Sequence, residues 1–369
     1  MEIHSNGKRF KALLLAAVIL LAQLFFPLFS REEAASAGTF SSADISSQPR
    51  ARPAEKLPGE LVPLGHAIGI SIFSDGVIVA GLTPVKTEYG SASPASDGGL
   101  RTGDVITGIN GAEVDSINRL RQLVGESGGE QLDVILSRNG KALNVRITPA
   151  AADGEGFKLG IWARDSIAGI GTMTFFDPSS KVFGALGHGI NDSDTGTLIP
   201  LSSGEVMMST ITGIRKGEAG KPGELKGDFE SSDSLGPLYS NCLTGVYGKT
   251  SGKKLGGHGR PVPVAAKNEI KTGPATIFSS IEGQDIKEYN IEILKVYSNA
   301  AASDRDMMIR VADEELLSKT GGIVQGMSGS PIIQNGKIIG AVTHVLVNDP
   351  KRGYAINVEK MLIDAYYEQ

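Results

Sequence analysis

The stretch GGIVQGMSGSPII, residues 321–333, decides the fold of the carboxyl-terminal half of the chain. Its small residues permit a tight turn that exposes the side chain of Ser328. The apolar residues at its end and the apolar run at residues 338–342 predict two strands joined by a turn at Asn335-Gly336. A serine placed before a β-hairpin, without strand–turn–helix alternation around it, indicates a β-rich domain and not the nucleophile elbow of an α/β-hydrolase.

Ser328 has the surroundings that a serine nucleophile requires. A serine hydroxyl is a weak nucleophile at neutral pH, so it needs an imidazole that removes its proton and donors that stabilise the oxyanion. The backbone N–H groups of Gly326 and Ser328 are the predicted donors, because a tight turn can point both at one anion. The loop is therefore a candidate hydrolase site.

His188 is the best candidate for the base. It lies in the run FGALGHGI, residues 183–190, where flanking glycines at a strand end leave an imidazole exposed yet fixed. His344 is the alternative, although its position inside the predicted strand at residues 341–345 is more typical of packing.

A third residue is expected to orient the base, and several carboxylates are candidates. Asp192 and Asp194 follow His188 closely, and Asp313 precedes Ser328 in the run IRVADE, residues 309–314. Proximity in sequence does not decide among them, because neighbours on a strand or turn can face opposite sides. The oxygen-rich turn at residues 191–194 lacks the full spacing of a calcium loop, so no metal and no cofactor are expected.

Composition sets the class of protein. The chain has 369 residues, enough for two or three domains, and 40% of them are hydrophobic, so real cores are expected. Its 36 basic and 41 acidic residues give a net charge of -5, which argues against nucleic acid as a partner. The 48 glycines indicate many tight turns between short strands. Cys242 is the single cysteine, so it forms no internal disulfide and is interpreted as a packed thiol.

The amino-terminal segment predicts export. Residues 12–29 are apolar apart from Gln23 and follow Lys8, Arg9 and Lys11. Residues 1–37 are therefore expected to be a signal peptide or a membrane anchor, with the bulk of the protein outside that membrane. Residues 38–58, rich in Ser, Ala and Pro, are expected to be a flexible linker.

Residues 59–150 resemble a PDZ domain. The run GLRTGDVI, residues 99–106, followed by ING at residues 109–111, carries the resemblance. Members of that family bind an extended peptide as an added strand next to a glycine-containing loop. The loop and strand GHAIGISI, residues 65–72, are the predicted counterpart, with Gly69, Ile70 and Ile72 as the peptide-binding residues.

The nucleophile loop is similar to that of chymotrypsin-like peptidases, with Ser330 in place of the last glycine of their Gly-x-Ser-Gly-Gly-Pro run. The expected fold is therefore mainly β and multidomain: a PDZ domain of α+β type, then a chymotrypsin-like double β-barrel over residues 151–369. The whole chain resembles the SpoIVB-type serine peptidases of endospore-forming bacteria, through the same runs in the same order. This resemblance implies Ser328 as nucleophile, His188 as general base and Asp313 as the third member.

The resemblance also implies a biological role. It implies an exported endopeptidase in the space between forespore and mother cell, which cleaves its own chain and a partner in a membrane-bound regulatory complex. That cleavage would trigger the intramembrane processing of a sigma factor. Two other functions stay open from the residues: a non-catalytic PDZ adaptor and a general extracytoplasmic quality-control protease, although in the latter the PDZ domain usually follows the catalytic domain.

Overall fold

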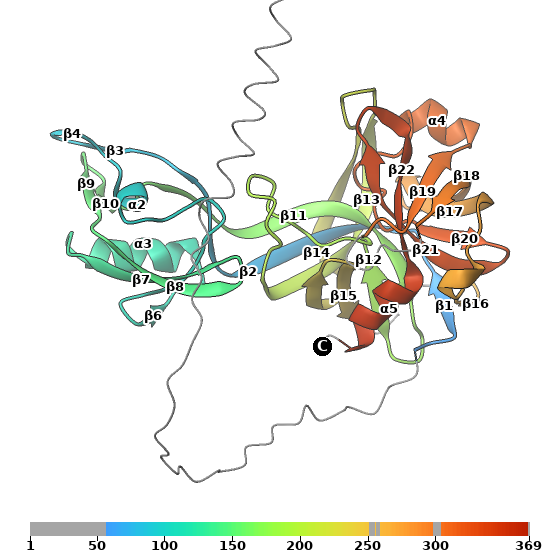
Figure 1. Ribbon diagram of the computed structural model, residues 1–369, viewed down its shortest axis with the longest axis horizontal. Coiled ribbons are helices and arrows are strands. Elements are labelled where there is room, and N and C mark those ends of the chain that lie inside the picture. Colours follow the sequence, from blue (N-terminus) through green and yellow to red (C-terminus); the bar gives the residue numbers. More distant parts are fainter. Residues whose placement is uncertain (1–56, 251–254, 256–258, 298–303, 368–369) are drawn as a thin grey trace, which may run out of the picture. The chain divides into compact units, whose positions relative to one another are not determined.

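The computed structural model describes residues 57–250, 255, 259–297 and 304–367 (Figure 1). The predicted signal peptide or anchor at residues 1–37 and nearly all of the predicted linker at residues 38–58 lie outside these residues. Within the described ranges, no helix is both long and apolar enough to cross a membrane.

Six antiparallel strands close into a first barrel. β2 closes it, because β2 pairs with β11 along one edge and with β13 along the other. The buried side chains of these strands, among them Ile68, Met173 and Val246, form one core. The barrel strands, in their order around the barrel, are β2 (Ala67–Leu82), β11 (Ile161–Phe176), β12 (Val182–Ala185), β15 (Gly245–Lys249), β14 (Glu224–Cys242) and β13 (Leu201–Arg215). Two short strands, β1 (Glu60–Pro63) and β16 (Val262–Pro263), extend the sheet beside β11.

A second closed barrel follows along the chain. Its strands, in their order around the barrel, are β17 (Gly273–Glu282), β18 (Asp285–Val296), β19 (Met307–Val311), β22 (Asp349–Asn357), β21 (Lys337–Leu346) and β20 (Pro331–Gln334). A 3-10 turn at Lys267–Glu269 precedes it, and helix α4 (Glu314–Thr320) follows β19. Helix α5 (Val358–Tyr367) ends the described chain and packs against Phe175, Val182 and Tyr247. The predicted mainly β, double-barrel class is confirmed.

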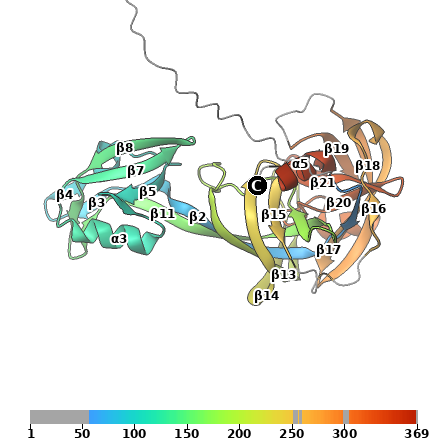
Figure 2. The same ribbon diagram turned by 90° about the horizontal axis from the view of Figure 1, so that it is seen from below.

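A separate small unit interrupts the first barrel between β2 and β11. We call residues 77–163 the inserted unit, because their buried side chains form a core of their own that includes Val79, Ile109, Leu132 and Leu159. Its further elements are β3 (Val85–Thr87), β4 (Gly90–Ala92), α2 (Pro94–Asp97), β5 (Val105–Ile109), β6 (Ala112–Glu113), α3 (Ile117–Glu126), β7 (Leu132–Arg138), β8 (Lys141–Ile147), β9 (Ala150–Ala152) and β10 (Gly156–Lys158). β2 and β11 lie side by side in both views (Figure 1 and Figure 2).

The boundaries of this unit differ from the prediction of a domain at residues 59–150 that precedes the peptidase domain. Residues 60–72 belong to the first barrel, and residues 151–163 belong to the inserted unit. The reason is that the two apolar runs at residues 69–72 and 76–80 are halves of one 16-residue strand and not two strands of one small domain. Alternation of apolar residues identifies a strand but not the sheet that it joins.

Three Asn-Gly pairs form tight turns, and one of them is the predicted turn at Asn335-Gly336. Asn110, Asn139 and Asn335 have φ of 50°, 53° and 52°, and the glycine after each also has positive φ. Two residues with positive φ suit a two-residue hairpin turn, which matches the twist of the flanking strands. Accordingly β5 pairs with β6, β7 with β8, and β20 with β21 directly across these turns.

Candidate active site

Ser328 and His188 each follow the third strand of a barrel, counted along the chain. His188 follows β12, the third strand of the first barrel along the chain. Ser328 lies between β19 and β20, the third and fourth strands of the second barrel. Both side chains are half-buried. Each therefore belongs to a loop at the end of a barrel strand, where a rigid sheet can hold a reactive side chain.

Strand β11 holds the Ser328 loop against the first barrel. The hydroxyl groups of Thr172 and Thr174 donate hydrogen bonds of 2.7 Å to the carbonyl oxygens of Gly326 and Gly329. The backbone N–H of Thr172 donates to the carbonyl oxygen of Ser328 at 2.9 Å. Both threonines are fully buried, so these bonds do not compete with water. The shape of the nucleophile loop thus depends on contacts between the barrels.

The loop leaves two backbone donors available. Gly329 N–H donates to Val342 and Ser330 N–H donates to Met327. Within the described part of the chain, the N–H groups of Gly326 and Ser328 donate no hydrogen bond. Gly326 has φ of +97°, a conformation that glycine adopts without strain and that turns its N–H out of the usual direction. Two such donors in one turn can bind a developing negative charge.

A second tight turn holds His188. Leu186 and Gly187 precede it with φ of +68° and +70°. Its Nδ1 lies 2.9 Å from the carbonyl oxygen of Gly189, which assigns the proton to Nδ1 and leaves Nε2 as an acceptor. Loss of hydration lowers the pKa of His188, and the hydrogen bond to Gly189 only partly opposes this effect. The imidazole is therefore neutral near pH 7 and able to accept a proton.

The loops of Ser328 and His188 are in contact, because a Cβ on Gly329 would lie 2.6 Å from the backbone nitrogen of Leu186, but the two side chains are not hydrogen-bonded to each other in the described structure. The hydroxyl of Ser328 donates instead to the carbonyl oxygen of Thr343 at 2.6 Å. Thr343 immediately precedes His344, whose ring stacks on that of His188 with centroids 4.8 Å apart and planes at 24°. A rotation of the Ser328 side chain about χ1 is thus the movement that would turn its hydroxyl from Thr343 toward the imidazole.

The carboxylate at this site is Asp304, which the sequence did not single out. Its Oδ2 lies 2.5 Å from Nε2 of His344. Partial burial opposes ionisation of Asp304, but its hydrogen bond to His344 holds its pKa below the usual value. No motif marks this residue, because it stands alone before β19 and meets His344 only through the closure of the second barrel. His344 itself was the predicted alternative base.

The predicted third residues lie elsewhere. Asp313 caps helix α4: its Oδ1 accepts from the N–H of Leu316 at 3.0 Å and its Oδ2 from the N–H of Asn290 at 3.3 Å. Asp192 is buried in its own turn, where it accepts backbone hydrogen bonds and pairs with Arg164 at 2.9 Å. Asp194 also pairs with Arg164. The structure corrects the assignment of Asp313, since the cap of α4 occupies one of its carboxylate oxygens and the backbone of β18 occupies the other.

We expect Asp313→Asn to retain nearly all peptidase activity, because an asparagine Oδ1 can still accept the hydrogen bond from Leu316. Asp313→Ala removes that acceptor and is expected to lower the free energy of unfolding by about 1 kcal/mol. Urea unfolding and the rate of cleavage per folded molecule measure the two effects. A loss of about 10³-fold or more in the asparagine variant would instead place Asp313 beside the base.

The predicted peptide-binding residues are part of the first barrel wall. Gly69 pairs with Ile170 of β11 on one side and with Met207 of β13 on the other. Ile70 and Ile72 are buried in the barrel core. A peptide strand needs an unpaired strand edge, and β2 has none here, so the prediction for Gly69, Ile70 and Ile72 was wrong.

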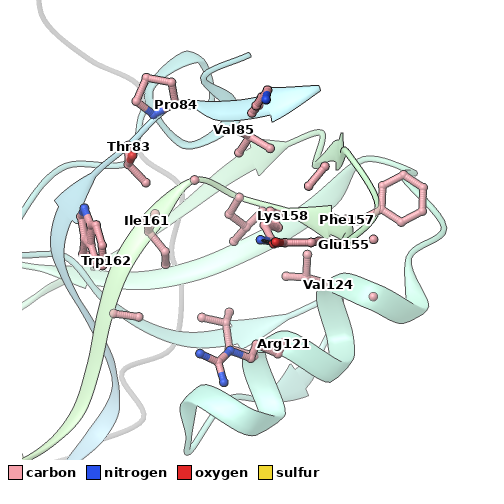
Figure 3. A pocket seen from close by; sticks show the side chains of 18 of the residues that line it. Thr83, Pro84, Val85, Arg121, Val124, Glu155, Phe157, Lys158, Ile161 and Trp162 are labelled. Atoms are coloured by element: carbon pink, nitrogen blue, oxygen red, sulfur yellow. Dashed lines mark hydrogen bonds and ion pairs between the residues drawn. The ribbon is translucent and has the colours of Figure 1, made fainter. Parts of the chain in front are cut away.

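The inserted unit has a different groove, with a volume of about 940 Å³ (Figure 3). One wall is helix α3, which contributes Leu120, Arg121 and Val124, and the facing wall is the start of β11 at Ile161 and Trp162. The start of β11 pairs with β2 on one edge. No other described strand pairs with it there, so its second edge is open beside α3.

Among the described residues, no group of three His, Cys, Asp or Glu side chains is arranged to hold a metal ion.

Family models match two parts of this chain. The model of the SpoIVB peptidase S55 family matches residues 155–362, which is more than half of the chain. The model of the PDZ domain matches residues 88–141, within the inserted unit. The prediction of a PDZ domain is thus confirmed.

Curated relatives match over a shorter range. The zinc metalloprotease RasP of Shouchella clausii is 31% identical over 130 residues, which are 32% of this chain and 30% of that protein. A putative zinc metalloprotease of Lactococcus lactis is 30% identical over 136 residues, 34% of this chain and 31% of that protein. This chain spans about a third of the length of these relatives.

Two solved structures are also similar to parts of the chain. The PDZ domain of an SdrC-like protein from Listeria monocytogenes is 27% identical and covers 25% of this chain and 90% of its own, with a TM-score of 0.20. The inactive form of Rv3671c from M. tuberculosis is 15% identical and covers 54% of this chain and 83% of its own, with a TM-score of 0.31.

Proposed function

This chain belongs to the SpoIVB peptidase S55 family, and from that premise we propose that it hydrolyses peptide bonds through an acyl-enzyme on Ser328, with His188 as general base. Family membership makes it a serine peptidase with a PDZ domain. The roles of individual residues are the proposal, and the geometry around Ser328 supports them.

The proposed reaction proceeds in two halves. The Ser328 hydroxyl turns from Thr343 toward His188, and its Oγ bonds to the scissile carbonyl carbon while Nε2 of His188 takes the proton. The N–H groups of Gly326 and Ser328 stabilise the oxyanion, and His188 then protonates the leaving amine as the C–N bond breaks. In the second half, water attacks the acyl carbon while His188 accepts its proton. The bond between that carbon and Oγ then breaks, the carboxylic acid product leaves, and His188 returns the proton to Oγ of Ser328.

One observation carries this proposal most strongly. The nucleophile loop is held by buried hydrogen bonds from Thr172 and Thr174 of the first barrel, which is also the barrel that carries His188. Such cross-barrel contacts keep two loops from distant parts of the chain in a fixed relation, which is what proton transfer between them requires.

Labelling with a serine-directed fluorophosphonate tests the proposal. We expect one covalent adduct per molecule of purified protein, and mapping by mass spectrometry is expected to place it on Ser328. An adduct on another residue, or cleavage activity in a protein that is never labelled, would contradict the assignment of the nucleophile.

We further propose that the groove between α3 and the start of β11 binds a peptide as an added strand. The open edge of β11 at Ile161 supplies backbone partners, and the apolar side chains of α3 supply a pocket for side chains of the ligand. The PDZ domain implies a peptide ligand, and this groove is where the described residues leave room for one.

Replacement of Trp162 tests this groove. Trp162 is 68% exposed and lines the groove, so Trp162→Ala is expected to weaken peptide binding about tenfold, the effect of losing one aromatic contact at an interface. Fluorescence anisotropy with random hexapeptide libraries, one with free and one with amidated carboxyl ends, measures binding. Tyr89→Ala is the matched control, because Tyr89 is 93% exposed and does not line the groove. Equal affinity of both variants would argue against this location.

We propose an exported location and a regulatory substrate for this peptidase. The basic and apolar segment within residues 1–37 supports export across the forespore inner membrane, with the chain either anchored or released after cleavage. The family supports a role in sporulation signalling, with the chain itself and a protein of a membrane-bound regulatory complex as substrates. Fractionation of sporulating cells, with wild-type protein and an active-site variant compared, tests both points.

A further inference from the structure

We propose that Asp304 and His344 form a positioning pair that orients His188 and stabilises the positive charge it acquires from Ser328, an inference that rests on the proposed peptidase function. Neither residue touches the reacting atoms in this arrangement. Both would act through the imidazole of His188.

The geometry links the pair to His188 on one side and to the nucleophile on the other. Asp304 holds His344 by the 2.5 Å contact with Nε2, and the ring of His344 stacks on His188. The hydroxyl of Thr343 donates to the backbone carbonyl of Asp304 at 3.2 Å, while the carbonyl of Thr343 accepts from Ser328. A shift of Asp304 would therefore move the surfaces that both His188 and Ser328 contact.

His188 needs such support because no carboxylate lies on its Nδ1. That nitrogen faces the carbonyl oxygen of Gly189, which orients the ring but carries only a partial negative charge. A hydrogen bond to an ionised group is stronger and compensates a cation better than one to a neutral carbonyl. The turn between β14 and β15, which lies against Gly189, offers the backbone of Cys242 there and no acidic side chain. The full negative charge nearest to the stack is that of Asp304.

The negative charge of the pair follows from the same contacts. The carboxylate of Asp304 is hydrogen-bonded to His344, and this bond holds the pKa of Asp304 below its usual value although partial burial opposes ionisation. The ionised carboxylate favours the imidazolium that forms on His188. Charged and titratable groups lie on two sides of His188. His344, Asp304 and Arg305 lie on the side of the second barrel, and Cys242 and Asp364 lie beyond Gly189.

The test is the pH dependence of fluorophosphonate labelling in the full-length protein. Asp304→Asn is expected to slow labelling at least tenfold, less than the roughly 10⁴-fold loss seen when a carboxylate in direct contact with the base is amidated. The midpoint on the acidic side is also expected to move to lower pH. The midpoint moves to lower pH because labelling requires neutral His188, and removal of a nearby negative charge lowers the pKa of the imidazole. Asp285→Asn, which removes an exposed carboxylate from the same barrel, is the matched control.

A second pair of variants separates positioning from folding. His344→Phe keeps a ring that can stack on His188 but loses the bond to Asp304, whereas His344→Ala loses both. We expect labelling to decrease from wild type to the phenylalanine variant and further to the alanine variant. The midpoint of a pH profile does not depend on the fraction of molecules that are folded. The midpoint can therefore be measured and compared even in a variant that is less stable than the wild type.

The outcomes distinguish this inference from the function on which it rests. If wild-type Ser328 is labelled while Asp304→Asn shows the wild-type rate and midpoint, the positioning pair is wrong and the peptidase stands. If Ser328 of the wild-type protein is not labelled at any pH, both are wrong. A slower rate together with a lower midpoint supports the pair, and a slower rate with an unchanged midpoint assigns Asp304 a structural role only.

Discussion

Ser328→Ala is expected to abolish fluorophosphonate labelling, with a loss of at least about 10³-fold in the rate of peptide hydrolysis. The variant removes the only atom that forms the acyl bond, and the oxyanion donors alone give a small residual rate. Thermal unfolding should be close to that of the wild type, because the hydroxyl makes one hydrogen bond, to the carbonyl of Thr343. Peptide binding by the inserted unit should be unchanged.

His188→Gln is expected to cause a similar loss, and the double variant no more than either alone, because the two residues act as one unit. Ser330→Ala is the control within the same loop: Ser330 is buried and its hydroxyl bonds to Ser279, away from His188.

In the wild type, kcat/KM should fall as the pH drops through the pKa of His188, which lies below the ordinary histidine value because the ring is desolvated. Activity in the Ser328→Ala protein within about tenfold of the wild type, measured free of contaminating peptidases, would refute the acyl-enzyme.

Gly329→Ala is the substitution for which we expect the largest loss of stability at the site. Gly329 has φ of +97°, and a Cβ there would lie against the carbonyl oxygen of Thr172 and 2.6 Å from the backbone nitrogen of Leu186. Both contacts are with backbone of the first barrel, which cannot turn aside as a side chain can. Strain at φ and overpacking add, so we expect the free energy of unfolding to fall by about 3 kcal/mol or more.

Comparison with Gly336→Ala separates the cost of backbone strain from the cost of steric overlap at Gly329. Gly336 also has positive φ, at +74°, but a Cβ there meets nothing within 4 Å. The variant is expected to lose only about 1 kcal/mol, the cost of a left-handed conformation in a non-glycine residue. Urea unfolding of both variants gives the comparison. Equal losses would mean that the contact between the nucleophile loop and β11 is not as close as described.

The parts of the fold that local chemistry determines could be predicted from the sequence. The three Asn-Gly turns and the strands beside them follow from the φ preferences of two adjacent residues. The candidate nucleophile and base were found for the same reason, because the glycines around Ser328 and His188 mark turns that expose a side chain. The structure places these two loops together.

The parts that depend on pairing between distant strands could not be predicted. Ile70 and Val79 belong to one strand, but one is buried in the first barrel and the other in the inserted unit. Nothing in the alternation of apolar residues distinguishes the two environments. Asp304 and His344 are 40 residues apart and meet because β19 and β21 both pair with β22, so their contact has no local signature.

The insertion between β2 and β11 has a consequence for the order in which a nascent chain matures. During synthesis the ribosome delivers residues 77–163 before the first barrel has its second strand, so this unit can reach its native form while the barrel is still open. Thr172 and His188 emerge next, but Ser328, Thr343 and His344 come only near the end of translation. The growing polypeptide can therefore present a folded inserted unit before the proposed nucleophile has been synthesised.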